Sequence, residues 1–293
     1  MRRARQKNPD PAFYHVLTRV AGSPRYFPLQ FRQAAEQLLR TIGYYVRAYS
    51  CQLAAYEIMG NHYHLILFFE SFRPLPLAEL QQRARLLYGR RSLLKTALWS
   101  SQDWLRFNRK LFDISALMQH INGEYAKWFN HRFNRRGHLW ADRFKNPELL
   151  DFRALQECLF YVELNAVRAG LVQRPEKWKA SSAWLRWKGQ DQDLIPLAEI
   201  FPEIPPEEIA AFYRFELYRR GAVSAQPGPP KTGLFLQRLR FFTDGLAIGT
   251  QTSVCHRLDQ LRTQGHYRHR KKPIAQLAGF LFTLREQRSH ARI

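Results

Sequence analysis

The 293-residue sequence contains few cysteines and no long apolar run. Its three cysteines, Cys51, Cys158 and Cys255, lie far apart and form no Cys-x-x-Cys pair. This spacing argues against a zinc ribbon and a disulfide framework, and it suits a reducing cytoplasm. There is no run of about 18 apolar residues, and the basic start leads into Pro9 and Asp10 rather than an apolar signal core. We therefore expect neither a membrane span nor a secretory signal.

Three motifs of other nucleotide-dependent or nucleic-acid-dependent proteins are also missing. The sequence has no Gly-x-x-x-x-Gly-Lys phosphate loop, so ATP-driven chemistry is not expected. It lacks the Arg/Lys-Gly-aromatic-Gly/Ala-Phe-Val run that an RNA-recognition motif needs. It also lacks the His-x-Glu followed by Cys-x-x-Cys that a zinc deaminase needs.

Acidic residues are scarce relative to basic ones. Asp and Glu total 24 against 46 Lys and Arg, which gives a formal net charge of +22 and a pI near 10.4. An excess of this size attracts polyanions. The hydrophobic fraction of 45% is ordinary for a protein that builds a core. Nucleic acid is therefore the leading candidate partner.

Periodicity and turn signals predict alternating strands and helices. We expect strands at 13–20, 51–59 and 62–69, the last two joined by a Gly60-Asn61 turn, and helices at 29–45, from a Ser115 cap, and from an Asp151 cap to about Val167, with Gly170 as its stop. Residues 1–190 would form a catalytic domain with a basic insertion at 71–112. Residues 191–230 would be a helical connector that ends in a Pro-rich linker, and 231–293 a basic, helical accessory domain.

A histidine pair gives the sharpest local signal. Residues 59–64 read Met-Gly-Asn-His-Tyr-His at the start of the third expected strand. Because side chains alternate along a strand, His62 and His64 share one face with Ile66 and Phe68. Both faces become apolar beyond the histidines, and unpartnered imidazoles buried there would be costly. The pair is either half-buried polar residues or the start of a divalent metal site, and this setting favours the metal site.

Tyr161 and Asn165 form a second candidate pair on the helix after Asp151. One helical turn separates them, so their side chains are neighbours beside the apolar stripe. A phenol, with an ordinary pKa of roughly 10, is a poor nucleophile, but it can attack a phosphodiester that a metal polarises. Asn165 could supply an oxygen ligand to that metal. Without the histidines, a core-edge aromatic and an incidental polar residue would be the better interpretation.

Three motifs in a fixed order give the chain a family resemblance. They are residues 59–64, residues 136–145 with Arg-Gly-His leading to Arg-Phe-Lys, and residues 161–170, which read Tyr-Val-Glu-Leu-Asn-Ala-Val-Arg-Ala-Gly. Over residues 13–187 the chain resembles the HUH single-strand transposases, and most of all the REP-associated tyrosine transposases that act on repetitive extragenic palindromes. Gly60 and Ala166 stand where the family has Pro. We expect Gly60 to loosen the turn and Ala166 to extend the helix.

The resemblance implies an α+β fold. It would have a central antiparallel β-sheet of RRM-like topology with packed helices, plus a mostly helical C-terminal extension. His62, His64 and Asn165 would hold Mg²⁺ or Mn²⁺ against a phosphate oxygen. Tyr161 would attack the phosphorus of single-stranded or hairpin DNA, leaving a 5′-phosphotyrosine and a free 3′-hydroxyl. Attack by another 3′-hydroxyl would reverse the chemistry and join strands without ATP.

Basic residues near the motifs and in the tail are candidates for DNA contact. They are Arg19, Arg135, Arg136, His138, Arg143 and Lys145, followed by Arg268, Arg270, Lys271 and Lys272 in the tail. For each, the alternative is a solvated surface charge. Trp140 and Phe144 could stack on unpaired bases, and for Trp140 the alternative is a core aromatic. The tail is expected to touch phosphates without reading bases.

Two other functions compete with this prediction. One is a non-catalytic binder of DNA palindromes derived from a transposase. The other is a single-stranded RNA-binding protein, which the missing motif argues against. We expect a bacterial cytoplasmic, nucleoid-associated protein with no membrane contact. The sequence leaves open a homodimer, and whether Tyr161 serves its own active site or that of a partner.

Overall fold

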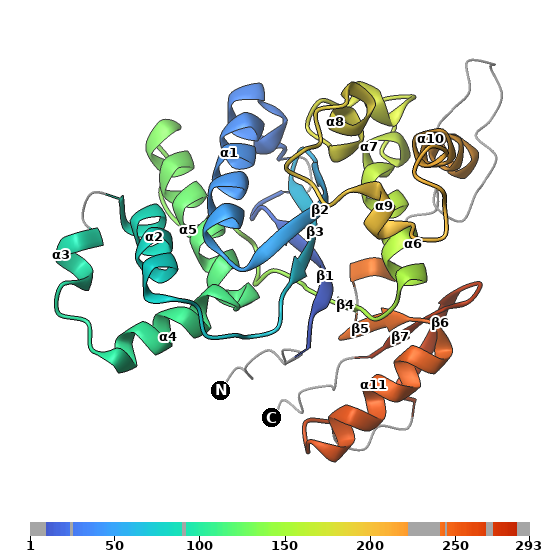
Figure 1. Ribbon diagram of the computed structural model, residues 1–293. Coiled ribbons are helices and arrows are strands. Elements are labelled where there is room, and N and C mark those ends of the chain that lie inside the picture. Colours follow the sequence, from blue (N-terminus) through green and yellow to red (C-terminus); the bar gives the residue numbers. More distant parts are fainter. Residues whose placement is uncertain are drawn as a thin grey trace, which may run out of the picture.

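The computed structural model describes residues 10–23, 26–89, 92–221, 241–243, 245–267 and 272–285. A seven-stranded sheet runs through the molecule in the order β2-β3-β1-β4-β5-β7-β6, with helices packed on it (Figure 1). Neighbouring strands are antiparallel except β4 and β5, which are parallel. The predicted α+β class is confirmed.

The first four strands have the predicted RRM-like order. β1 (Ala12–Arg19), β2 (Cys51–Ile58), β3 (His62–Phe69) and β4 (Glu148–Leu149) stand in the order β2-β3-β1-β4. Helix α1 (Arg32–Ala48) connects β1 to β2, and α5 (Ile114–Arg132) lies between β3 and β4 in the chain. The 3₁₀ turn η1 (Pro28–Gln30) precedes α1. β3 is therefore a middle strand.

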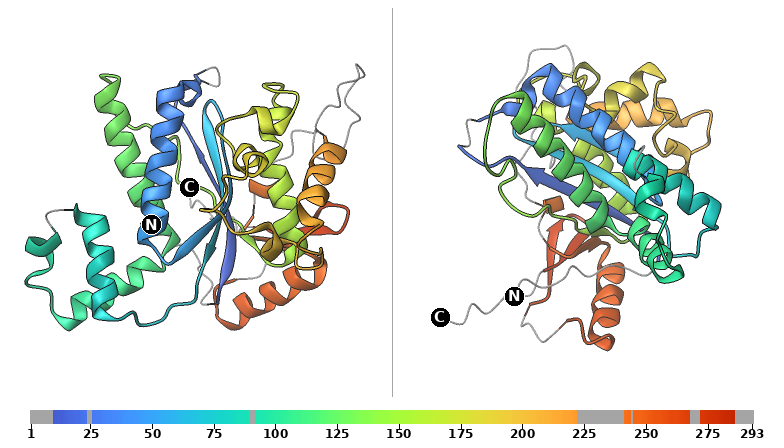
Figure 2. Two further views of the ribbon diagram at one scale, coloured as in Figure 1. Left: turned by 45° about the horizontal axis from the view of Figure 1, so that its top comes forward. Right: turned by 90° about the vertical axis from the view of Figure 1, so that its left-hand side faces the viewer.

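Alternating side chains give the sheet two buried faces. One face packs against α1 and α5 through Tyr14, Val16, Tyr63, Leu65 and Leu67. The other face meets α6 (Phe152–Glu163) through Phe13, Ile66 and Phe68. Figures 1 and 2 show α1 and α5 on one side of the sheet and α6 on the other. Because His62 and His64 share a face with Ile66, they lie on the α6 side.

Capping residues determine where helices α5 and α6 begin. The Asp151 carboxylate accepts a hydrogen bond from the Ala154 N–H at 2.9 Å, which confirms Asp151 as the N-cap of α6. For α5 the predicted cap was wrong. Asp113, not Ser115, is the N-cap, and its carboxylate accepts from the Ser115 N–H at 2.7 Å. The Asp113 side chain therefore caps the helix two residues before the position at which the Ser115 hydroxyl was expected to cap it.

The basic insertion forms three helices, α2 (Leu77–Tyr88), α3 (Ser92–Thr96) and α4 (Ser101–Leu111). They enclose a small core of their own that includes Leu80, Phe107 and Leu111. After α6, the chain continues through α7 (Asn165–Arg168), η3 (Pro175–Lys177), α8 (Ser182–Lys188), α9 (Leu197–Ile200) and α10 (Ile209–Arg220). The division of the chain into domains stays a prediction, and the expected linker at 225–230 lies outside the described residues.

The prediction of a mostly helical C-terminal extension was wrong. Its described residues form η4 (Phe241–Thr243), β5 (Ala247–Gly249), α11 (Gln251–Thr263), β6 (Ile274–Ala278) and β7 (Leu281–Leu284). β5 pairs with β4, so this part continues the central sheet. The strands are three to five residues long and flank a basic run. Such short strands carry too little alternation to be separated from helix by periodicity.

Candidate functional site

β1 brings a third histidine beside the predicted pair. The Nε2 atom of His15 lies 2.8 Å from Nδ1 of His64, and the two rings are nearly parallel. The His62 ring meets the His64 ring edge-on, with centroids 5.1 Å apart. His15 was missed in the sequence because only the register, which places Leu17 opposite His64, brings β1 to this position. A histidine in an otherwise apolar strand was the one available signal.

Hydrogen bonds define the tautomers of the three rings. His15 Nδ1 contacts the main-chain carbonyl of Phe242, which only accepts, so Nδ1 carries the proton and Nε2 accepts. His64 Nδ1 must then donate to His15, which leaves the lone pair of His64 on Nε2. His62 Nδ1 bonds to Oδ1 of Asn61 at 2.8 Å, and its lone pair is likewise on Nε2. Both predicted ligands therefore keep a ring nitrogen suited to a metal.

Burial holds these imidazoles neutral. It lowers the pKa of His15 to about 4, and the positive charge of Arg168 acts in the same direction. Burial lowers the pKa of His62 to about 4 as well, helped by Arg19 and Arg168. The pKa of His64 lies well below its usual value, first through burial and then through its histidine neighbours. Neutral imidazole is the form that binds a metal ion.

Tyr161 lies against this histidine cluster. Its ring centroid is 5.8 Å from that of His15 and 5.9 Å from that of His64, both edge-on. The Phe242 ring of η4 covers it at 4.8 Å, and Tyr161 is only 7% exposed. The structure thus brings together the predicted nucleophile and the predicted histidines, which are about 100 residues apart in the chain.

The tyrosine helix ends sooner than its periodicity predicted. It breaks at Leu164, and the four-residue helix α7 follows. The buried carboxylate of Glu57 accepts the N–H of Asn165 at 3.0 Å and the N–H of Ala166 at 3.2 Å, so these amides leave the α6 ladder. The expectation that Ala166 extends the helix was therefore wrong. Burial raises the pKa of Glu57 well above its usual value, against the effect of these N–H groups.

Arg168 occupies the space that the break creates. Its Nη2 donates to the Tyr161 carbonyl at 2.9 Å and also to Oδ1 of Asn165. Its guanidinium carbon lies 4.0 Å from the centroid of the Tyr161 ring. Burial lowers the pKa of Arg168, while the Tyr161 and Glu57 side chains oppose that shift. Glu57 and Arg168 were not singled out in the sequence, since no local pattern links a strand glutamate to an arginine after a helix.

Asn165, the third predicted metal ligand, is buried beside Tyr161 and Arg168. Its Nδ2 donates to the Val162 carbonyl at 3.2 Å, and its Oδ1 faces Arg168. Within the described ranges, no group of three or more His, Cys, Asp or Glu is arranged to hold a metal ion. The candidate donor set is two imidazole nitrogens and one amide oxygen. The two nitrogens fit a divalent ion, and the oxygen would have to be shared with or released by Arg168.

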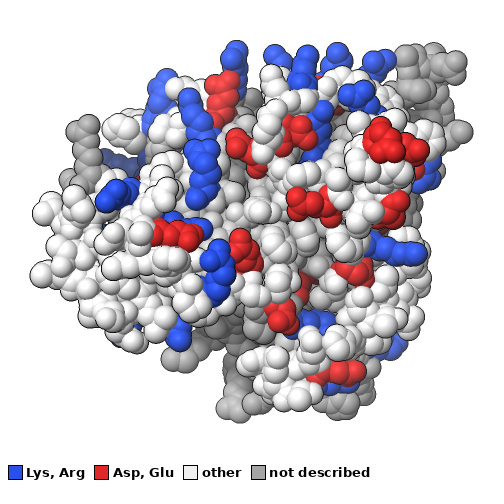
Figure 3. Space-filling view, viewed as in Figure 1, with Lys and Arg blue, Asp and Glu red and all other residues white. Residues whose placement is uncertain are grey.

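Several predicted DNA contacts gather near the His62 end of the sheet. Arg19 is exposed at the end of β1, directly opposite His62. The 136–145 segment runs beside β1 through the Leu17–Lys145 and Val20–Trp140 bridges. On it the following predicted side chains are exposed: Arg136, His138, Arg143 and Lys145. In the view of Figure 3, Lys and Arg line the upper edge of the molecule, whereas Asp and Glu lie mostly below and to the right.

Other predicted contacts have a different place. Arg135 braces its own loop, because its guanidinium donates to Oδ1 of Asn130 at 3.2 Å and to the His138 carbonyl at 2.9 Å. Of the predicted tail residues, Lys272 is exposed, and three lie outside the described residues: Arg268, Arg270 and Lys271.

The aromatic residues of the 136–145 segment belong to the core. Trp140 donates its Nε1–H to the Asn122 carbonyl at 2.9 Å and lies edge-on to Tyr63 at 5.6 Å. Phe144 is only 8% exposed. Of the two open interpretations of these rings, the structure favours the core over stacking on unpaired bases.

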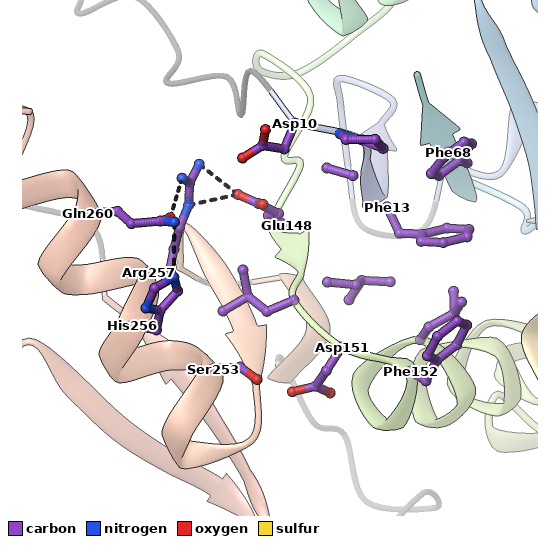
Figure 4. A pocket seen from close by; sticks show the side chains of 15 residues that line it. Asp10, Phe13, Phe68, Glu148, Asp151, Phe152, Ser253, His256, Arg257 and Gln260 are labelled. Carbon is purple, nitrogen blue, oxygen red and sulfur yellow. Dashed lines mark hydrogen bonds and ion pairs between the residues drawn. The ribbon is translucent and has the colours of Figure 1, made fainter. Parts of the chain in front are cut away.

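Two cavities lie away from the histidine cluster. One of about 520 Å³ opens between β1, α6 and α11, and Figure 4 shows Phe13, Phe68 and Phe152 on one side of it. Across from them, Arg257 forms a buried ion pair with Glu148 at 3.0 Å. A second of about 510 Å³ lies between α5 and residues 137–144. Neither is lined by His62, His64 or Tyr161, so neither holds the candidate nucleophile.

Comparison with known proteins gives a likeness to solved structures alone. No family model matches the chain, and no curated protein matches it. Among solved structures, the chain is similar to a REP-associated tyrosine transposase bound to a REP hairpin, with 15% identity and a TM-score of 0.42. That similarity covers 67% of this chain and 87% of the other. No helix in the described part of the chain is long and apolar enough to cross a membrane.

Proposed function

We propose that this chain is a metal-dependent, single-tyrosine DNA transposase that cleaves and rejoins single-stranded or hairpin DNA, acting on repetitive palindromic elements. One observation carries the proposal. A tyrosine from α6 lies against a buried histidine cluster in which His62 and His64 both keep their Nε2 lone pairs for another partner. The sequence motifs that surround these residues support the same reaction class.

The reaction begins with attack of the Tyr161 oxygen on the phosphorus of a phosphodiester. The bond from phosphorus to the 3′-oxygen breaks, and the phenol proton is transferred overall to that oxygen. The products are a 5′-phosphotyrosine and a free 3′-hydroxyl. Attack of another 3′-hydroxyl on the phosphotyrosine returns the phenol and joins two strands, so the energy of the cleaved bond is kept.

His62, His64 and Asn165 are the residues that would hold Mg²⁺ or Mn²⁺ next to Tyr161. When bound, the ion supplies positive charge to a phosphate oxygen and so makes the phosphorus more electrophilic. His15 orients His64 through its hydrogen bond, and Asn61 orients His62. Such outer partners fix the direction in which a ligand ring presents its nitrogen.

Exposed basic side chains at this end of the sheet support a DNA substrate. Arg19 and the segment at 136–145 lie beside the strand ends that carry His62. Phosphate contacts of this kind supply affinity and orientation without sequence information. The net charge of +22 agrees with such a substrate.

Phe242 has to move before DNA can reach the nucleophile. It lies against the Tyr161 ring at 4.8 Å, and Tyr161 is 7% exposed. This cover favours a second candidate function, a protein that binds DNA palindromes without cutting them. The two functions differ in one product, the covalent bond between Tyr161 and DNA.

Labelled single-stranded hairpin DNA, incubated with the protein and Mn²⁺ and then run on a denaturing gel, separates these functions. We expect label to remain on the parent polypeptide and to be absent from Tyr161→Phe, while DNA affinity stays nearly equal, because one hydroxyl contributes little to a phosphate-dominated interface. Binding by both proteins with no adduct, across several metals and substrates, would support the palindrome binder instead.

Two histidine variants test the metal assignment in the same assay. His62→Ala and His64→Ala should abolish both cleavage and its dependence on Mn²⁺. His120→Ala is a matched control, because His120 is half-buried on α5 and contacts Tyr49 rather than the cluster. Cleavage at the parent rate by either His62→Ala or His64→Ala would show that the metal assignment is wrong.

A further inference from the structure

Arg168 carries a buried amino group without an acceptor in the part of the chain that the structure describes. This group, Nη1, is shielded from solvent and makes no hydrogen bond there, although Nη2 of the same side chain has two acceptors. No ion pair of Arg168 occurs among the described residues. A buried charged donor without a partner is expensive, and a native structure rarely keeps one without a use.

The unpartnered group lies next to the proposed nucleophile. The guanidinium carbon is 4.0 Å from the centroid of the Tyr161 ring, and Nη2 holds the Tyr161 carbonyl at 2.9 Å. A phosphate in position for attack by the Tyr161 hydroxyl would therefore lie within a few ångströms of Arg168, roughly the range of a direct contact. The same movement of Phe242 that exposes the hydroxyl would admit this phosphate.

Guanidinium chemistry suits carboxylate and phosphate oxygens, and phosphate is the anion that the proposed reaction brings to this place. Its planar N–H groups match phosphate geometry, and the group keeps its charge even when buried. The other arginine buried near α6, Arg186, has its charge balanced within the protein, at 3.5 Å from Glu163 and 3.2 Å from Asp191. Arg168 has no ion pair of this kind among the described residues, and the Glu57 carboxylate acts on its charge without forming one, so an external anion could still pair with the guanidinium directly.

We infer that Arg168 forms an oxyanion site that binds a non-bridging oxygen of the scissile phosphate through Nη1, independently of the metal. Its role in the reaction rests on the proposed function, whereas its affinity for phosphate does not. Arg168 adds positive charge at the phosphate as negative charge develops there, and this lowers the barrier for attack by Tyr161.

The first test measures phosphate binding without metal. The full chain is heated in EDTA with increasing inorganic phosphate, because a ligand that binds the folded state raises Tm. We expect phosphate to raise Tm of the parent and of Arg153→Gln, a control from an exposed site on α6. Arg168→Gln should lose that rise. Equal shifts in the parent and Arg168→Gln, or no shift in the parent, would overturn the anion site.

Arg168→Lys covers the case in which Arg168→Gln fails to fold. A lysine keeps the charge, but one ammonium group cannot hold the Tyr161 carbonyl and a phosphate oxygen in the same fork geometry. We expect its phosphate-induced rise in Tm to be smaller than that of the parent. A rise equal to that of the parent would overturn the geometric part of the proposal.

The second test measures the rate of adduct formation with Mn²⁺ and hairpin DNA. Loss of one oxyanion donor slows acyl-transfer enzymes on the order of 100-fold, and we expect a similar loss in Arg168→Gln and partial rescue of Arg168→Ala by guanidinium chloride. A parent that shows the phosphate effect but forms no adduct would overturn the proposed reaction and support the anion site. An adduct at the parent rate in Arg168→Gln would overturn the catalytic role of Arg168.

Discussion

Two arginines near the tyrosine helix, the buried Arg186 and the half-buried Arg168, have opposite surroundings. Arg186 of α8 donates to the Ala54 and Ile195 carbonyls and forms ion pairs with Glu163 and Asp191. Among the described residues, Arg168 at the end of α7 has a carbonyl and an amide oxygen as acceptors for Nη2 and no acceptor for Nη1. Both clusters hold buried polar groups on the same side of the sheet.

The difference between the clusters distinguishes a group of residues that stabilises the fold from one that could bind and react with a ligand. Around Glu163, Ser182 and Tyr213 each donate a hydroxyl at 2.6 Å. The Arg186 guanidinium lies 3.5 Å away and supplies the counter-charge inside the protein, although its Nε makes no hydrogen bond. Around Tyr161, Arg168 Nη1 has no hydrogen-bond partner within the described residues, and the tautomers of His62 and His64 leave a lone pair on each Nε2. The group of Arg186, Glu163, Ser182 and Tyr213, here called the satisfied cluster, pairs its charges within the chain and so fixes the structure. A polar group that lacks a partner within the protein is instead a place for a ligand.

The largest expected effect is on stability at the satisfied cluster. Arg186→Gln leaves the Glu163 carboxylate buried without its cation, which should lower the free energy of unfolding by about 3–5 kcal/mol. Arg168→Gln should lower it by about 1 kcal/mol or less, because it loses hydrogen bonds but no ion pair. Urea unfolding of both variants checks this. Equal losses of unfolding free energy in the two variants would contradict the proposed difference between the two arginines.

A smaller effect concerns pH and the histidine cluster. The pKa of His15 is about 4 in the folded chain against 6.5 ordinarily, so the unfolded chain binds more protons between these values. Stability should fall as the pH drops from 6.5 to about 4, by about 3 kcal/mol for His15. Urea unfolding in EDTA checks this, in a His120→Gln background, since burial also lowers the pKa of His120 to about 4. A flat profile would contradict it.

Glu57→Gln should have an intermediate effect on both stability and reaction rate. Glutamine keeps one of the two acceptors for the Asn165 and Ala166 N–H groups, and the lost bond should lower the free energy of unfolding by about 1–3 kcal/mol. Because Asn165 and Tyr161 then lose their fixed spacing, the adduct should form more slowly. The gel assay and urea unfolding measure the two effects, and an unchanged adduct rate would count against the positioning role.

Ser182→Ala should have a small effect on stability and none on the reaction. It removes one hydroxyl from Glu163, while Tyr213 and Arg186 remain, so a loss of about 1–2 kcal/mol is expected. The adduct should form at the parent rate, because Ser182 lies in the satisfied cluster. A slower adduct rate at equal stability would show that the two clusters are coupled.

Gly60, in the turn before His62, has a packing role that the sequence motif did not predict. A Cβ on Gly60 would lie 2.9 Å from Cδ1 of Phe27, so the residue admits an aromatic ring against the hairpin. We had expected Gly60 only to loosen the turn. Its neighbour Asn61 also has a specific contact, because its Oδ1 accepts a hydrogen bond from Nδ1 of His62.

Sequence alone determined the strands that carry the histidines, the Asp151 cap and the candidate set of His62, His64 and Tyr161. Those features depend on local alternation, capping and spacing, which the order of residues contains. Only the tertiary structure decided that His15, Glu57, Arg168 and Phe242 lie at the candidate site, and that the C-terminal part continues the sheet. Each depends on strand register or on packing between segments far apart in the chain, because hydrogen bonds and charges act at short range in space whatever the separation in sequence.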